Sequence, residues 1–297
     1  MSNHSRKARQ KNWLHQTSRK ESGNIQFSIC LLITQLVCYD THCYMEYKNL
    51  KDFKLGAGHI INDIWYPRVT SIINIKAKPA LYRYYASLPN YEAGETIKQK
   101  SADEGTIIHE VIQAIMVGDS PALTDDVRPA AEAFIKINEQ MKISVAREHI
   151  EKRIINFDER YSGTVDAIAE IGGKIGVLDI KTSQAIYRDY CLQTSAYMEP
   201  LRYEIPEIST RWILRVDQNQ SCRKCGAIKR TKGGNEKVKL PWKNGFAKNC
   251  EHDWGVVKGE IEIREFPDFD DDYQAFLGAK KLWEWENIGW LKEIGYK

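Results

Sequence analysis

Helical spacing of apolar residues is clearest between residues 101 and 118. One stripe there holds four apolar side chains: Ile108, Val111, Ile112 and Ile115. Ser101 and Glu104 have the form of a capping box, and Gly118 follows the last apolar position, so we predict a helix over 101–118. Comparable patterns, one of them ended by Pro200, predict further helices over 78–88, 127–141, 186–199 and 270–294.

Strand patterns occupy most of the remaining apolar segments. Short runs rich in β-branched residues predict strands or extended segments at 65–73, 150–157, 210–216 and 259–266. Residues 162–171 and 175–182 form a pair of such runs around Gly172-Gly173, which is typical of a two-residue hairpin turn. With that turn, the numbers of facing residues sum to 345, so Asp166 lies directly opposite Asp179.

Charges in this predicted hairpin need an explanation. Directly opposed residues have Cβ atoms about 5 Å apart, where two carboxylates destabilise the strand pair. A divalent cation bound by Asp166 and Asp179 would compensate, and their oxygen ligands suit Mg²⁺ or Mn²⁺. Lys181 shares a face with Asp179 and could stabilise negative charge there. The alternative is a solvated hairpin whose acids lie on its rim.

Composition indicates a soluble globular protein of one large domain or two small ones, since 42% of its 297 residues are hydrophobic and 28% charged. The net charge of +3 is unevenly distributed. Residues 1–44 carry +4 and residues 219–258 carry +7, which leaves about −8 on the rest. Such a basic insertion is either a solvated loop or a surface for an anionic partner such as nucleic acid.

The N-terminal residues 1–44 are interpreted as a poorly ordered extension, with the working domain at 45–297. The longest apolar stretch, 27–39, is shorter than the ~18 residues of a membrane span, so we expect no membrane association. Reading this stretch as part of a targeting peptide is an alternative, which leaves organellar targeting open. Seven cysteines, an odd number, do not indicate a secreted disulfide framework, and no phosphate-binding P-loop is present.

Several motifs occur in one order along the chain: GTIIHE (105–110), a strand glutamate followed by GTVD (151–166), LDIKTS (178–183) and QTSAY (193–197). In this order, after the opening YPRVTSII, the chain resembles the RecB-like exonuclease family of the PD-(D/E)xK nuclease superfamily. The resemblance covers about residues 64–290 apart from the insertion. It implies a restriction-endonuclease-like fold and phosphodiester hydrolysis in DNA.

The resemblance also implies roles for individual residues. Asp166 and Asp179 would bind the catalytic Mg²⁺ or Mn²⁺, together with a backbone carbonyl near Ile180. Lys181 would orient or activate the attacking water and stabilise the developing charge. His109 would be a further metal ligand, although a histidine beside a helix core is also a common structural residue.

Three more residues complete the predicted catalytic set. Glu151 either points into the site as an acidic helper or lies at the solvent edge of its strand. Gln193 and Tyr197 are one helical turn apart and share a face. They would support the lysine or contact the DNA backbone, or else Tyr197 simply packs on the sheet.

The insertion, residues 219–258, has a second group of candidate ligands. Cys222 and Cys225 form a C-x-x-C-G knuckle, and Cys250 with His252 follows it. Three thiolates and an imidazole match a closed structural Zn²⁺ site. Free thiols are one alternative, and an iron–sulfur cluster, with upstream help from Cys30, Cys38 or Cys43, is a less favoured one.

Together these patterns predict an α/β fold with a mixed central sheet flanked by helices and a zinc-binding insertion. We expect a Mg²⁺- or Mn²⁺-dependent DNA exonuclease acting on single strands or duplex ends in DNA repair, recombination or phage DNA processing. The expected location is the cytoplasm of a prokaryotic or virally infected cell, with a helicase or recombinase partner left open. The alternatives are an inactive nucleic-acid-binding protein of the same fold and a zinc-ribbon regulatory module.

Overall fold

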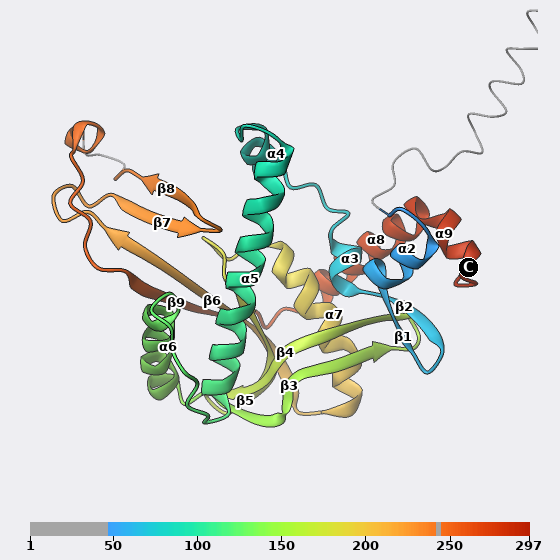
Figure 1. Ribbon diagram of the computed structural model, residues 1–297. Coiled ribbons are helices and arrows are strands. Elements are labelled where there is room, and N and C mark those ends of the chain that lie inside the picture. Colours follow the sequence, from blue (N-terminus) through green and yellow to red (C-terminus); the bar gives the residue numbers. More distant parts are fainter. Residues whose placement is uncertain (1–46, 242–244) are drawn as a thin grey trace, which may run out of the picture. The chain divides into compact units, whose positions relative to one another are not determined.

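The computed structural model describes residues 47–241 and 245–297 (Figure 1). The predicted extension at 1–44, with Cys30, Cys38 and Cys43, lies outside the described residues. Residues 47–297 form one compact unit. Among the described helices, none is both long and apolar enough to cross a membrane.

A mixed, mostly antiparallel sheet forms the centre of the fold. In the described residues its strands are β3 (Ser144–Asn156), β4 (Tyr161–Ile171), β5 (Lys174–Lys181), β6 (Ile208–Ser221) and β9 (Lys258–Glu265). They pair in the order β3-β4-β5-β6-β9, with β5 and β6 parallel and the other neighbours antiparallel. The last two residues of β6 also pair with β7 (Ile228–Lys232), which forms a hairpin with β8 (Asn235–Lys239), so the sheet of seven strands continues into the insertion.

The register predicted for the β4–β5 hairpin is confirmed where the two strands pair. The pairs run from Ile171↔Lys174 to Ala167↔Leu178, and each sums to 345. Gly172 and Gly173 have φ of +61° and +78°, the left-handed conformation that a tight hairpin turn requires at both positions. The local turn signal therefore fixed which side chains share a face.

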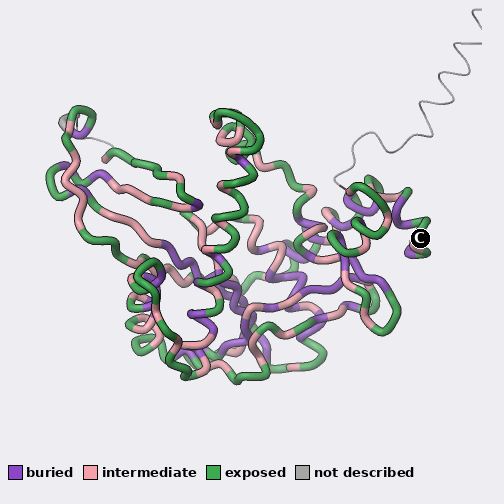
Figure 2. The backbone as a smooth tube through the Cα atoms, viewed as in Figure 1, coloured by how far each residue is buried: buried purple, intermediate pink, exposed green. Residues whose placement is uncertain are grey.

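Helices cover both faces of the sheet, as predicted (Figure 1). On one face α5 (Tyr91–Met116) and α6 (Arg128–Met141) enclose a core that includes Ile112, Phe134 and Leu178. On the other face α7 (Asp189–Glu204) packs between the strands and α8 (Asp270–Glu286). Figure 2 shows that buried positions concentrate in the central strands, whereas the β7–β8 hairpin is mostly intermediate or exposed.

Smaller elements complete the chain: α2 (Leu50–Ala57), β1 (Gly58–Ile61), β2 (Ile64–Pro67), α3 (Val69–Ile73), α4 (Pro79–Ala86), the 3₁₀ helix η1 (Gly245–Asn249) and α9 (Ile288–Glu293). The single helix predicted over 270–294 is wrong. The first helix ends before Asn287, and a second one begins after it. The backbone and side-chain N–H groups of Asn287 both donate to the carbonyl of Trp283.

Two predicted helix ends are also wrong. The helix predicted to begin at Ser101 begins at Tyr91, because the Asn90 side chain accepts a hydrogen bond from Ala93 N and caps it. Helix α7 continues through Pro200 to Glu204. A proline leaves the carbonyl four residues earlier without its helical donor, and here the Tyr161 hydroxyl donates to that carbonyl, of Ala196, at 2.9 Å.

Candidate active site and metal centre

Residues far apart in the sequence meet where β4 and β5 separate beyond Ala167↔Leu178. Asp166 comes from β4, Asp179 and Lys181 from β5, His109 from α5 and Gln193 from α7. Contacts link all five side chains, as the next paragraphs describe. The structure therefore brings together the acids, the lysine, the histidine and the glutamine predicted from the sequence.

Asp179 is the most buried of these groups, with no solvent exposure. Its Oδ1 accepts a hydrogen bond from Gln193 Nε2 at 3.0 Å. Its Oδ2 lies 2.5 Å from Lys181 Nζ, yet no described donor reaches that oxygen in hydrogen-bond geometry. Burial raises the pKa of Asp179 to about 6, since it outweighs the attraction of Lys181, and Asp166 adds to the rise.

Asp166 ends the ladder between β4 and β5. Its Oδ2 accepts the backbone N–H of Ile180 at 2.7 Å, so this carboxylate replaces the next backbone partner of β5. The same oxygen is 3.7 Å from His109 Nδ1. Burial raises the pKa of Asp166, although Lys181 and the Ile180 hydrogen bond oppose the rise. The strands stop pairing at Ala167↔Leu178, so Asp166 and Asp179 do not form the directly facing pair predicted; burial raises the pKa of both carboxyl groups, which interact within one cluster.

His109 faces these acids while most of its ring is buried; its side chain is 27% exposed. Burial lowers the pKa of His109, and Lys181 lowers it further, while Asp179 and Glu151 act in the opposite direction. The imidazole is therefore neutral near pH 7, which is the form that ligates metals. Its position off the apolar stripe of α5 is confirmed.

Lys181 is the cation of the cluster, and its side chain is 18% exposed. Burial on its own would lower the pKa of Lys181, but Asp179 and Asp166 more than offset it and the net shift is upward. The ammonium also lies 5.2 Å from the centre of the Tyr190 ring. Lys181 therefore stays protonated at neutral pH, as a donor and a positive charge.

Glu151 lies across from Asp166, because the flanking pairs are Ile150↔Ala167 and Lys152↔Val165. Its φ is +49°, an unusual backbone conformation for a non-glycine residue, directly after the bulge in β3. Its side chain is exposed, and its Oε1 accepts a hydrogen bond from Gln113 Nε2 at 2.7 Å. Glu151 therefore lies at the solvent edge of β3, across from Asp166.

Gln113 is the residue of this site that sequence reasoning missed. It is 7% exposed, and its Nε2 also donates to the carbonyl of Asp166 at 3.2 Å. One signal could have revealed it: a polar residue four positions after His109, beside the apolar stripe of the same helix. Gln113 ties α5 to the strand that carries Asp166.

Gln193 and Tyr197 support Asp179 from α7. Gln193 Nε2 donates both to Asp179 Oδ1 and to the Tyr197 hydroxyl, each at 3.0 Å. Tyr197 is 3% exposed and packs against Gly163, where an added Cβ would lie 2.4 Å from the ring. The Tyr197 ring therefore does pack on the sheet, and it also fixes the amide that holds Asp179.

The fit of a divalent cation depends on the donors around Asp179. Carboxylate oxygens suit Mg²⁺ or Mn²⁺, and Asp179 Oδ2 is a buried oxygen whose one close polar neighbour among the described residues is Lys181. The Lys181 ammonium is the cation that this oxygen now contacts. As they stand, Asp166, Asp179 and His109 do not form a close group of metal-ligand atoms, so a bound cation would have to replace the Lys181 contact and draw these groups together.

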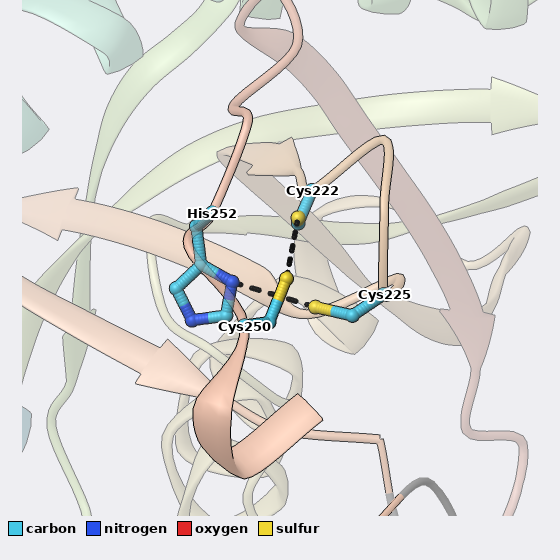
Figure 3. A group of neighbouring side chains, drawn as sticks. All are labelled: Cys222, Cys225, Cys250 and His252. Carbon is cyan, nitrogen blue, oxygen red and sulfur yellow. Dashed lines mark hydrogen bonds between the residues drawn. The ribbon is translucent and has the colours of Figure 1, made fainter. Parts of the chain in front are cut away.

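The insertion brings a second set of ligands together (Figure 3). The ligand atoms of Cys222, Cys225, Cys250 and His252 all lie within 4.8 Å of one another, and the described residues contain no other such group of three or more. The sulfurs of Cys222 and Cys250 are 4.0 Å apart, and Cys225 Sγ is 3.4 Å from His252 Nδ1. A tetrahedral zinc with Zn–S bonds of ~2.3 Å separates its ligands by about 3.8 Å. This group could hold a metal such as zinc.

A tight backbone turn and a lowered thiol pKa both favour metal binding by this cluster. Gly226, with φ of +75°, closes the knuckle by donating its N–H to the carbonyl of Cys222. Burial opposes ionisation of Cys222, but donors including the Cys225 N–H and His252 stabilise the thiolate and lower the pKa of Cys222 to about 6. The cysteines of the described residues form no disulfide. Among the described residues, the buried core around the cluster comprises Ala227, Ala247 and two cysteines, with Cys250 and Trp254 packed partly buried against it, so apolar packing here is limited.

Comparison with known proteins found no family model that matches the chain, and no curated protein matches it in sequence.

Proposed function

We propose that this protein is a divalent-metal-dependent nuclease that hydrolyses phosphodiester bonds in DNA, with a RecB-like, restriction-endonuclease-like fold. One observation carries the proposal: Asp179 is fully buried, its Oδ2 contacts the protonated Lys181 at 2.5 Å, and Asp166 and His109 lie in the same cluster. A buried carboxylate whose pKa is raised and which lies beside a second acid, a histidine and a lysine is typical of functional sites.

Asp166, Asp179 and His109 would hold Mg²⁺ or Mn²⁺ between β4, β5 and α5. When bound, the ion supplies a Lewis acid that polarises the phosphate and lowers the pKa of a coordinated water. Gln193 fixes Asp179 through one amide hydrogen, and the Ile180 N–H fixes Asp166. The carboxylates therefore keep their orientation without rearranging the strands.

Lys181 acts as a donor and a charge in this proposal. Because its pKa is raised, it does not accept a proton from water near neutral pH. Its ammonium instead stabilises the negative charge that develops on the phosphoryl oxygens. Released from Asp179 by the bound cation, Lys181 would be free to face the phosphate.

The test compares labelled DNA digestion by wild type, Asp179→Asn and Glu170→Gln in Mg²⁺ and Mn²⁺. Glu170 is an exposed acid on the neighbouring strand, β4, close to the hairpin turn, so its variant controls for the loss of one negative charge. We expect Asp179→Asn to lose at least about a hundredfold in kcat/KM, the scale of one essential electrostatic group, and Glu170→Gln to retain activity. Labels at the 5′ and 3′ ends of single strands and duplexes then give polarity and strand preference.

Metal binding provides a readout that needs no turnover. Mn²⁺ should raise the melting temperature of wild type and of Glu170→Gln, because binding to the folded state stabilises it, but not that of Asp179→Asn. Wild type that binds DNA without cutting it would favour the inactive binding protein. Equal activity of wild type and Asp179→Asn would refute this site.

A further inference from the structure

The β7–β8 hairpin of the insertion packs against α5 (Figure 1). Gly233, in its turn, donates its N–H to both carboxylate oxygens of Glu104, at 3.1 and 3.0 Å. A Cβ on Gly233 would lie 2.3 Å from Ser101 Oγ and 2.4 Å from the carbonyl oxygen of Ile97. This close approach holds the hairpin in one position against the helix.

A basic cavity of about 110 Å³ lies between the hairpin and the helices α4 and α5. Its lining includes three cations, Arg230, Lys232 and Lys237. In the measure used for such cavities, one water needs only ~10–15 Å³, so the space admits a larger group. Tyr84 and Asn235 line it as well, and the two side chains are hydrogen-bonded at 2.5 Å.

The cations of this cavity exceed the carboxylates that pair with them. Arg230 Nε contacts both oxygens of Asp217, at 2.7 and 2.8 Å, and Lys232 Nζ is 3.7 Å from Glu104. No carboxylate in the described part of the chain forms an ion pair with Lys237, whose ammonium lies 3.8 Å from the centre of the Tyr84 ring. Although Lys237 is exposed, partial desolvation by the cavity wall lowers the pKa of Lys237 and Arg230 adds to the effect, as expected where cations lack a balancing anion.

The cavity adjoins the candidate active site through a single residue. Thr182 directly follows Lys181. Its carbonyl accepts a hydrogen bond from Arg230 Nη2 at 3.1 Å, and its hydroxyl is 3.4 Å from Lys232 Nζ. A nucleic-acid strand whose scissile phosphate lay at Lys181 would therefore pass close to these cations.

We propose that this cavity binds a non-scissile backbone phosphate of the nucleic acid and so holds the strand across the active site. The proposal deepens the nuclease assignment and rests on it. Arginine and lysine in a polar recess are suited to a phosphate group, and Tyr84 offers a ring beside the strand. The insertion then supplies part of the substrate-binding surface.

The test measures binding of a labelled single-stranded oligonucleotide in Ca²⁺ by wild type, Lys237→Gln and Lys239→Gln. Both lysines are exposed on β8, and only Lys237 lines the cavity, so Lys239→Gln controls for loss of one charge. We expect Lys237→Gln to bind about tenfold more weakly, with the salt slope reduced by about 0.7, and Lys239→Gln to bind nearly as wild type. Equal loss in both variants, or none in Lys237→Gln, overturns the proposal.

Oligonucleotides with one neutral methylphosphonate linkage locate the bound phosphate. The phosphate in the cavity is the one whose neutral linkage lowers the affinity of wild type but does not lower the affinity of Lys237→Gln any further. If no linkage behaves in this way, the proposal is overturned. If wild type never cleaves DNA yet binds it in a Lys237-dependent way, the nuclease assignment fails and the phosphate site stands.

Discussion

Adding one methyl group at Gly163 tests how the candidate active site is held together. The new Cβ would lie 2.4 Å from Tyr197 Cε1 and 3.1 Å from Cδ1, far inside ordinary contact distance. Tyr197 is 3% exposed and bonded to Gln193, so its ring has little room to move aside. Since Gln193 also holds Asp179, a displaced ring should disturb the carboxylate as well.

The expected loss of stability follows from two opposing effects. Overpacking a buried site costs about 1–3 kcal/mol, while replacing a strand glycine by alanine returns about 0.5–1 kcal/mol of backbone entropy. Gly163→Ala should therefore lower the free energy of unfolding by about 1–2 kcal/mol, measured by urea denaturation. Gly278→Ala is the control, because Gly278 is exposed in α8 with no atom within 4 Å of its added Cβ; we expect it to be neutral or stabilising.

A double-mutant cycle isolates the steric contact. Tyr197→Leu removes the ring that meets the added Cβ, so Gly163→Ala should cost much less in that background than in wild type. Additive effects of the two substitutions, or a Gly163→Ala protein as stable as wild type, would show that this contact does not position the site.

Three further predictions concern other parts of the molecule. Purified protein should contain about one zinc per chain, and both chelation and Cys250→Ser should lower the melting temperature, with zinc restoring only the chelated wild type. Burial and nearby arginines lower the pKa of His59 to about 4. The neutral His59 therefore contributes about 1 kcal/mol to the free energy of unfolding above pH 6.5, and this contribution is lost as the pH falls toward 4. His59→Gln should make the free energy of unfolding in urea less dependent on pH over that window. Gly233→Ala should increase proteolysis of the insertion more than Gly234→Ala, since both have positive φ but only Gly233 contacts α5.

Features encoded by neighbouring residues could be predicted from the sequence. The register of the β4–β5 hairpin follows from Gly172-Gly173, because a two-residue turn fixes every facing pair. The grouping of Cys222 with Cys225 likewise follows from a short knuckle, and Cys250 with His252 completes it in the structure. In each case the constraint acts over a few residues along the chain.

Features that depend on partners distant in the sequence could not be predicted from the sequence. Helix α7 passes Pro200 because the hydroxyl of Tyr161, thirty-five residues before Ala196, satisfies the freed carbonyl. Gln113 reads as one more polar residue until the structure places Glu151 and the Asp166 carbonyl beside it. Local propensity contains no information about such donors and acceptors, so sequence reasoning ended α7 too early and omitted Gln113 from the site.

The same distinction bears on what the insertion does. Its ligand set was visible in the sequence, but its connection to the candidate active site was not. From the knuckle, the chain enters β7 within three residues of Cys225 and reaches Gly233, which is fixed to Glu104 of α5. Five residues further along that helix lies His109. One helix thus carries both Glu104, which binds the hairpin turn, and His109, which faces the acids. This shared helix favours an insertion that serves the site over a separate zinc-ribbon module.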